Sequence, residues 1–119
     1  MDSILDSVKK ALGIAPENTD FDDILVMYIN GILSTILPQL GVGPENGYTI
    51  EDAGDEWTDY ISDLTNLESV KTYIALKVRL IFDPPTSSAV LESIKAMISE
   101  LEWRLNVTVD PGKVGEEGT

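Results

Sequence analysis

The residues of this chain that could do chemistry are mostly acids, and the first cluster of them precedes a long apolar segment. Asn18, Asp20 and Asp22 have the spacing of the first three ligands of a calcium-binding loop. That loop also needs a glycine at its sixth position and a bidentate acid at its twelfth, where this chain has Asp23 and Ile29. We therefore interpret these acids as the start of a helix, where the positive end of the helix dipole favours negative charge.

A second acidic run, residues 51–56, has the residue types needed for paired-carboxylate acid–base catalysis. Nothing near it suggests a nucleophile or a pocket that would shift a carboxyl pKa, so a solvated charge run is the better interpretation. The chain has no cysteine and no histidine, which removes thiol chemistry and the common zinc and iron sites. We expect no enzymatic activity, no metal and no other cofactor.

The glycine-rich segment 41–47 is partly similar to a dinucleotide-binding motif. Asn46 stands where the third glycine belongs, and Pro44 interrupts the segment. The segment also follows a predicted helix, whereas the motif must follow a strand. We interpret it as a structural loop.

The main element predicted from the sequence is a long helical hairpin, residues 66–105, with its turn at residues 82–88. Two consecutive prolines end the first arm, because each disfavours the helical conformation of the preceding residue and lacks a backbone donor. The second arm has one apolar stripe at helical spacing: Val90, Leu91, Ile94, Met97, Ile98, Leu101 and Leu105. Its start has two alternatives, a cap at Asp83 with Pro84 in the first turn, or a later cap at Thr86 or Ser87.

The first arm, which Asn66 is expected to cap, is apolar over more than one face. Its stripe consists of Val70, Ile74, Val78 and Ile81, and three further side chains widen it: Tyr73, Leu76 and Leu80. A single neighbouring helix would not cover that width. We therefore expect a partner on this arm.

The other predicted elements are short, except for one. We expect a helix over residues 3–12 ended by Gly13, a long helix from Thr19 or Asp20 to about Pro38, and a short helix over residues 55–63 with Trp57, Tyr60, Ile61 and Leu64 inward. Residues 48–50 are expected to be extended, and residues 106–109 alternate like a short strand.

These elements predict an all-α fold, a small bundle of four to five helices with a long C-terminal hairpin. The predicted organisation is one helical domain, residues 1–109, followed by a flexible tail, residues 110–119. Apart from Val114 the tail has no core-forming side chain, so it either has no role or becomes ordered against another subunit. We expect no signal peptide at the start of the chain, because acids interrupt its first residues.

The predicted long second helix has one feature of a membrane span, because no charged residue occurs between Asp23 and Glu45. Spanning needs about 20 consecutive, predominantly apolar residues. Polar residues, glycine and proline interrupt this run on one side, so we predict a buried core helix and no membrane contact.

The net charge of -13 is unevenly distributed along the chain. Residues 1–65 carry 2 lysines against 13 acids, whereas residues 66–105 carry 5 basic and 5 acidic residues. Such an anionic surface repels DNA, whose phosphates bind lysine and arginine. Any DNA near this protein is expected to pass it without specific binding.

Two segments of the hairpin carry a resemblance to a known family. The first segment is Val70-Lys71-Thr72-Tyr73-Ile74-Ala75-Leu76-Lys77-Val78-Arg79-Leu80-Ile81-Phe82-Asp83-Pro84-Pro85-Thr86-Ser87-Ser88, and the second, further along the chain, is Leu101-Glu102-Trp103-Arg104-Leu105-Asn106. Together they resemble the head–tail connector proteins of long-tailed bacteriophages. These are also called adaptor or head-completion proteins. The resemblance is densest over residues 66–107 and extends more loosely over residues 20–43.

The resemblance implies a structural virion protein, located at the head–tail interface and, during assembly, in the host cytoplasm. Such proteins form a ring beneath the portal, expected to follow its twelve-fold symmetry, which connects the DNA-filled head to the tail and extends the DNA channel. The implied partners are other copies of the chain, the portal protein, and a stopper or tail-completion protein. Genomic DNA passes through without specific binding.

Three groups of residues are candidates for these contacts. For contact between subunits we name Leu76 and Leu80, with Lys77 and Arg79 pairing across the interface at about 0–1 kcal/mol each. For contact with the portal, by analogy with the family, we name Trp103, Arg104, Val107, Val109 and Lys113. For the channel lining we name the acids Asp52, Asp55, Glu56 and Asp59.

Two alternatives stay open. Trp103 is either a core residue or an interface anchor, because it lies beside the stripe of the second arm. The strong charge of residues 1–65 also fits a small acidic DNA mimic that inhibits a nucleic-acid-binding enzyme. If Leu80 contacts a neighbouring subunit, replacing it with Glu should leave a folded monomer and abolish rings.

Overall fold

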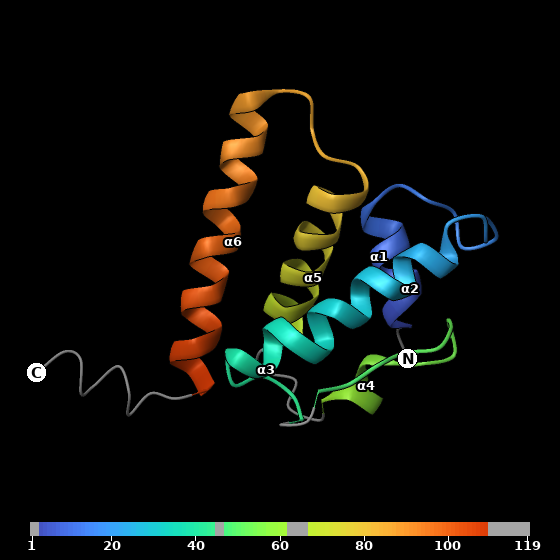
Figure 1. Ribbon diagram of the computed structural model, residues 1–119, viewed down its shortest axis with the longest axis horizontal. Helices are drawn as coiled ribbons and strands as arrows, with labels where there is room; N and C mark the ends of the chain where they lie inside the picture. The colour runs from blue at the N-terminus through green and yellow to red at the C-terminus, as the bar shows by residue number, and fades with distance from the viewer. Residues whose placement is uncertain (1–2, 45–46, 62–66, 110–119) are drawn as a thin grey trace, which may run out of the picture.

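The protein is described by a computed structural model over residues 3–44, 47–61 and 67–109. Its elements are α1 (Ile4–Ala11), α2 (Asp22–Gly31), a π-helical turn η1 (Ile32–Ile36), α3 (Leu37–Gln39), α4 (Trp57–Tyr60), α5 (Leu67–Phe82) and α6 (Ser88–Val109) (Figure 1). Because α2, η1 and α3 follow one another without a break, the described residues form five helical segments. The described residues contain no strand, only an isolated bridge between Ser3 and Glu56, so the all-α prediction is confirmed.

The predicted hairpin is present as α5 and α6, which run antiparallel (Figure 1). The Ser87 hydroxyl accepts a hydrogen bond from the Val90 N–H at 3.3 Å, and α6 begins at Ser88. This is the later of the two predicted caps, so the alternative with Asp83 as the cap is wrong. Asn66, the predicted cap of the first arm, lies outside the described residues.

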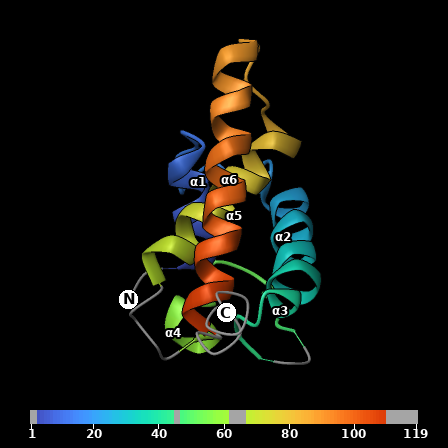
Figure 2. The ribbon, with the colours of Figure 1, turned by 90° about the vertical axis from the view of Figure 1, so that its left-hand side faces the viewer.

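Helix α5 is at the centre of the bundle, because α1, α2 and α6 all pack against it. Seen from the α6 side, α1 and α2 lie on opposite sides of the hairpin (Figure 2). The core side chains of α5 are Val70, Tyr73, Ile74 and Val78, all of them fully buried. Of the α6 side chains that the structure describes, Ile94, Ile98 and Leu105 are buried in the core, and Leu101 packs against it. The predicted stripe of α6 is therefore covered along its middle, while its flanking residues Val90 and Met97 are 45% and 49% exposed.

Helix α1 follows the prediction for residues 3–12. The Ser3 hydroxyl accepts a hydrogen bond from the Asp6 N–H at 3.2 Å and caps the helix. Gly13 has a φ of +79°, a left-handed conformation that glycine adopts without strain, and it ends the helix. Ile4, Leu5 and Val8 are buried.

The long second helix begins at Asp22, slightly later than predicted, and contains a π-helical turn that the sequence did not predict. Within this turn the Ser34 hydroxyl donates to the carbonyl oxygen of Asn30 at 2.5 Å. Such back-bonding competes with the backbone hydrogen bonds of a helix, which is consistent with the local change of pitch. Leu25, Ile29, Ile32, Leu33 and Leu37 are nevertheless buried, so the predicted core helix is confirmed. None of the helices in the described ranges is both long and apolar enough to cross a bilayer.

The segment 48–50, predicted to be extended, forms no strand and is held by one side chain of α2. The Asn30 amide donates to the Ile50 carbonyl at 3.0 Å, and its oxygen accepts from the Ile50 N–H at 2.7 Å. These two bonds satisfy both polar backbone groups of a residue that is 2% exposed. Asn30 thus takes the place of a strand partner.

Helix α4 is shorter than the predicted helix over residues 55–63. Asp59 accepts a hydrogen bond from the Glu56 N–H at 3.0 Å, which caps the first turn. Trp57 is buried and donates its indole N–H to the Ser7 hydroxyl at 3.0 Å, and Tyr60 is also buried. Ile61 is half-buried, and Leu64 lies outside the described residues.

The predicted strand over residues 106–109 is wrong, because α6 continues to Val109. Leu105 is 1% exposed and the Asn106 amide donates to the Leu40 carbonyl at 3.3 Å, so the end of α6 is packed against the bundle. Extending an existing helix adds one backbone hydrogen bond for each residue. The strand preference of four alternating residues cannot outweigh the stability gained from these bonds. The predicted tail, residues 110–119, lies outside the described residues.

A hydrogen bond between the buried Tyr73 and the half-buried Glu102 joins the arms of the hairpin. The Tyr73 hydroxyl donates to the Glu102 carboxylate at 2.7 Å. Burial raises the pKa of Tyr73 above its usual value, and the hydrogen bond and charge of Glu102 raise it further. Because the tyrosine pKa is higher in the folded state than in the unfolded state, protonated Tyr73 stabilises the folded state. This contribution is complete at pH values below the unfolded pKa of about 10, and it is lost as the pH rises through the folded pKa.

We therefore expect the free energy of unfolding to fall as the pH rises above about 10, and to fall less steeply in a Tyr73→Phe variant. At neutral pH the variant should be less stable by about 1–2 kcal/mol, because the Glu102 carboxylate loses a donor. Urea unfolding at a series of pH values measures both effects. Burial also raises the pKa of Tyr60, so the comparison between variant and wild type isolates Tyr73. Parallel pH profiles for the two proteins would contradict the assignment.

Candidate functional site

The described surface has an open groove of about 1460 Å³ between α1 and α5. We call it the α1–α5 groove. Its walls are α1 and the following loop on one side, residues 53–56 at one end, and the outward face of α5 on the other. Small residues dominate the lining, namely Ala11, Gly13, Ala15, Ala53, Gly54 and Ala75. They leave the floor open to a side chain from outside.

Cations line this groove in a chain that is otherwise strongly acidic. Lys10 on α1 and Lys71 on α5 contribute to its walls, together with the acids Asp6 and Glu56. The Lys71 ammonium lies 5.8 Å from the centroid of the Trp57 ring and 3.6 Å from the Glu68 carboxylate. The lining is therefore balanced in charge, against a net charge of -13 for the whole chain.

The residues predicted to contact another subunit separate onto two faces of α5. Leu76 borders the groove and is half-buried. Arg79 follows Ala75 by one turn on the same face; it is half-buried, and its Nε has no acceptor within the part of the chain that the structure describes. Lys77 and Leu80 lie on the face of Tyr73: the Lys77 ammonium is 5.9 Å from the Tyr73 ring, and Leu80 packs against the core.

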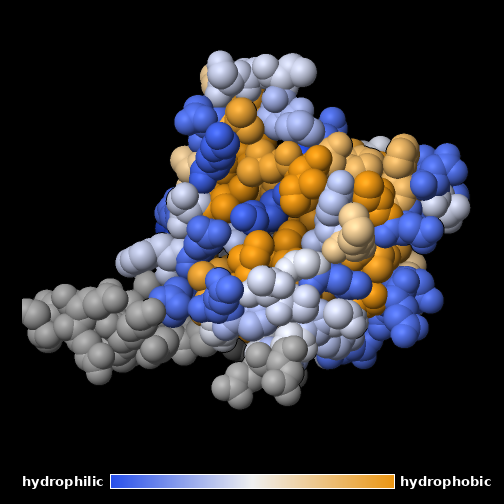
Figure 3. Space-filling model, in the orientation of Figure 1, coloured by the Kyte–Doolittle hydropathy of each residue, from blue (hydrophilic) through white to orange (hydrophobic). Residues whose placement is uncertain are grey.

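A second feature is an exposed ridge at the start of α2. Phe21, Ile24 and Met27 are 41%, 38% and 60% exposed, and the exposed acids Asp20 and Asp23 alternate with them. We call these five residues the α2 ridge. Figure 3 shows hydrophobic residues gathered on this face of the molecule, over α2, α5 and α6. Phe21 also contacts Phe82 edge-on, with ring centroids 5.2 Å apart, so the ridge is fixed to the end of α5.

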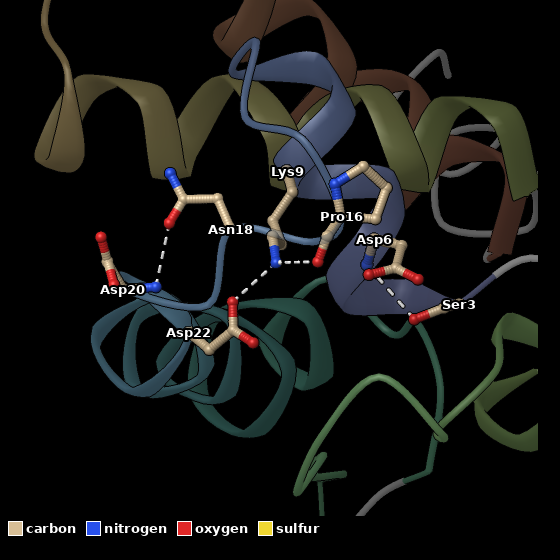
Figure 4. Close-up of polar contacts among 7 residues, drawn as sticks. All are labelled: Ser3, Asp6, Lys9, Pro16, Asn18, Asp20 and Asp22. Carbon is tan, nitrogen blue, oxygen red and sulfur yellow. Dashed lines mark hydrogen bonds and ion pairs between the residues drawn. The ribbon is translucent and has the colours of Figure 1, made fainter.

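A side chain that the sequence analysis did not single out, Lys9, holds the α2 ridge in place. Lys9 is 1% exposed, and its ammonium lies 2.8 Å from an Asp22 carboxylate oxygen and donates to the Pro16 carbonyl at 3.0 Å (Figure 4). The Asn18 side chain accepts from the Asp20 N–H at 3.1 Å in the same loop (Figure 4). The sequence did contain a signal for the burial of Lys9, because Lys9 lies one turn after Leu5 on the apolar face of α1.

The predicted portal contacts lie at the end of α6. Trp103 is 61% exposed, so the alternative that it belongs to the core is wrong. Arg104 is exposed and donates from Nε and from a terminal nitrogen to the Glu100 carboxylate, at 3.1 and 2.9 Å. The side chains of Val107 and Val109 and the whole of Lys113 lie outside the described residues.

The predicted channel acids include carboxylates that accept hydrogen bonds from backbone N–H groups of their own loop. The Asp55 carboxylate accepts from the Glu51 N–H at 2.7 Å, and Asp52 accepts from the Gly54 N–H at 2.8 Å. Asp59 caps α4, and Glu56 borders the α1–α5 groove. Over the described ranges, no cluster of three or more His, Cys, Asp or Glu residues could hold a metal ion.

Comparison with known proteins gives one match. A family model described as "Phage connector protein" matches residues 4–112. The matched range includes every helix of the structure, from α1 to α6. No curated protein and no solved structure matches the chain.

Proposed function

This chain belongs to the phage connector protein family, and from this premise we infer that it forms a ring beneath the portal which joins the DNA-filled head to the tail. The family is structural, and membership supports a place in the virion among other head and tail proteins. The observation that carries the proposal is the match over residues 4–112. The finer parts of the proposal are the ring, expected to be twelve-fold, the partners, and the DNA channel.

The exposed surface supports an assembly. Seven large hydrophobic side chains of the described residues are exposed, three of them in the α2 ridge; the others are Ile81, Val90, Met97 and Trp103. Single exposed apolar residues are ordinary, but several on one face indicate a contact surface. The acids of residues 1–65 would give a channel a negative lining, along which DNA moves without binding.

The proposal is tested by mixing the purified chain with the portal protein of the same phage. We expect the two to co-sediment and electron microscopy to show a ring of this chain on the portal. The chain alone can be monomeric if the portal templates the ring, so an isolated monomer is compatible with the proposal. No binding to the portal, combined with competition against DNA for an enzyme, would favour the acidic DNA mimic instead.

Within this proposal, Trp103 is assigned to the portal contact. Replacing Trp103 with Ala should weaken co-sedimentation with the portal by about tenfold or more, because exposed tryptophans that become buried often dominate an interface. Thermal unfolding should be almost unchanged, since the side chain is 61% exposed. Lys95→Ala, another exposed position on α6, is the matched control. Equal binding by both variants would remove Trp103 from the contact.

A further inference from the structure

We propose that the α2 ridge of one copy docks into the α1–α5 groove of the next copy, and that this contact closes the ring. The inference rests on the proposed function and adds to it the two surfaces that meet. It also assigns one occupant, a second copy of this chain, to the α1–α5 groove. The argument uses the charges, the exposed apolar side chains and the positions of these two surfaces.

The groove has the chemistry to receive an acidic, apolar element. Lys10 and Lys71 line it, and Arg79 lies one turn further along the same face of α5. Ile14 and Leu76 supply apolar walls between them. The Arg79 Nε is buried and has no acceptor in the described ranges.

The ridge has the complementary chemistry. Asp20 and Asp23 are exposed, because the nearby Asp22 is the acid that pairs with Lys9. Between them project Phe21, Ile24 and Met27, which are large side chains exposed by about two fifths or more. A contact that buries these side chains in the groove removes apolar surface from water and brings acids to lysines.

The two surfaces are placed as a ring requires. A closed ring of identical subunits is built from a head-to-tail contact, in which one patch meets a different patch on the next subunit. The ridge belongs to α2 and the groove to α1 and α5, and α1 and α2 lie on opposite sides of the hairpin (Figure 2). Each subunit can therefore offer both surfaces at once.

Charge also restricts where the ridge can dock. With a net charge of -13, most of the surface repels two further acids. In the lining of the groove the lysines equal the acids in number, two of each, and Arg79 adds a further positive charge beside it. The contact is therefore favoured by electrostatic complementarity as well as by burial.

The first test is a charge exchange, read out as ring formation on the portal. Lys10→Glu and Asp23→Lys should each reduce ring formation by about tenfold or more, because each places like charges opposite one another. The double variant, which carries both changes, should recover most of the loss. Lys95→Glu and Glu92→Lys on α6 make the same changes in net charge at exposed positions outside both surfaces, and they should form rings normally.

The second test uses the absence of cysteine from the natural chain. Met27→Cys in the ridge and Thr72→Cys in the groove, combined in one chain, should give a ladder of disulfide-linked oligomers when rings assemble under mild oxidation. Each single-cysteine variant should give no ladder. Circular dichroism establishes that all variants are folded.

The outcomes separate this inference from the proposed function. Rings that form normally in Lys10→Glu and Asp23→Lys, with no ladder from the double-cysteine chain, would overturn the docking and leave the ring intact. Dimers from Met27→Cys alone would show a two-fold contact between ridges and would also overturn it. Failure of the wild-type chain to form rings on the portal would overturn the proposed function and this inference together.

Discussion

Replacing Asp22 with Ala is expected to lower the free energy of unfolding by about 3 kcal/mol, the largest effect we predict for an ion pair in this protein. Among the described residues, the substitution leaves the Lys9 ammonium, which is 1% exposed, with the Pro16 carbonyl as its one remaining partner, at 3.0 Å. A buried charge that loses its counter-ion has a high desolvation penalty. Urea denaturation followed by circular dichroism measures the change.

Lys9→Met is the matched control, because it removes the charge and keeps most of the apolar stem. We expect it to change stability by no more than about 1 kcal/mol, since replacing a buried charge with an apolar residue of similar size is often neutral. The double variant Lys9→Met with Asp22→Ala should be more stable than Asp22→Ala alone. If the two single variants lose the same stability, the buried ammonium is not the cause.

The ion pair also has a consequence for assembly, because Asp22 lies between two residues of the α2 ridge, Phe21 and Asp23, in the sequence. Lys9 holds Asp22 from α1 while Phe21 contacts Phe82 at the end of α5. These two contacts orient the first turn of α2, so that Asp20 and Asp23 project outward. The buried pair thus positions the acids that we assign to the subunit contact.

Gly47→Ala is expected to lower the free energy of unfolding by a similar amount, about 3 kcal/mol. Gly47 has a φ of +85°, which is unfavourable for any residue with a Cβ. An added Cβ would also lie 2.8 Å from the Ser34 Cα, and this backbone belongs to the π-helical turn η1. The loop would have to move away from α2, which would strain the bonds between Asn30 and Ile50.

Gly31→Ala provides the comparison for this prediction. Gly31 is helical, and an added Cβ meets no atom within 4 Å. We expect this variant to be more stable by about 0.5–1 kcal/mol, because alanine favours the helix over glycine. Thermal unfolding of the two variants under the same conditions tests both signs. Two similar melting temperatures would show that the close approach at Gly47 is unimportant.

The local sequence was sufficient to predict the hairpin. Pro84 and Pro85 must interrupt a helix, and the apolar residues on either side repeat at helical spacing, so two antiparallel helices follow from the chain itself. Ser3 and Gly13 likewise mark the ends of α1. The choice between Asp83 and Ser87 as the cap of α6 needed coordinates, because both residue types cap helices equally well.

Other features were decided only by the tertiary structure. A lysine on an apolar face and an asparagine within an apolar helix show no partner in the sequence, because Asp22 and Ile50 are 13 and 20 residues away along the chain. The short alternation after Leu105 resembled a strand, yet packing against Leu40 extended α6 through it. The positions of the ridge and the groove depend in the same way on how α1 and α2 cross α5. Local sequence therefore determined the helices of this connector protein, and long-range packing determined which side chains are left for its neighbours, because burial depends on contacts between segments that are distant in the sequence.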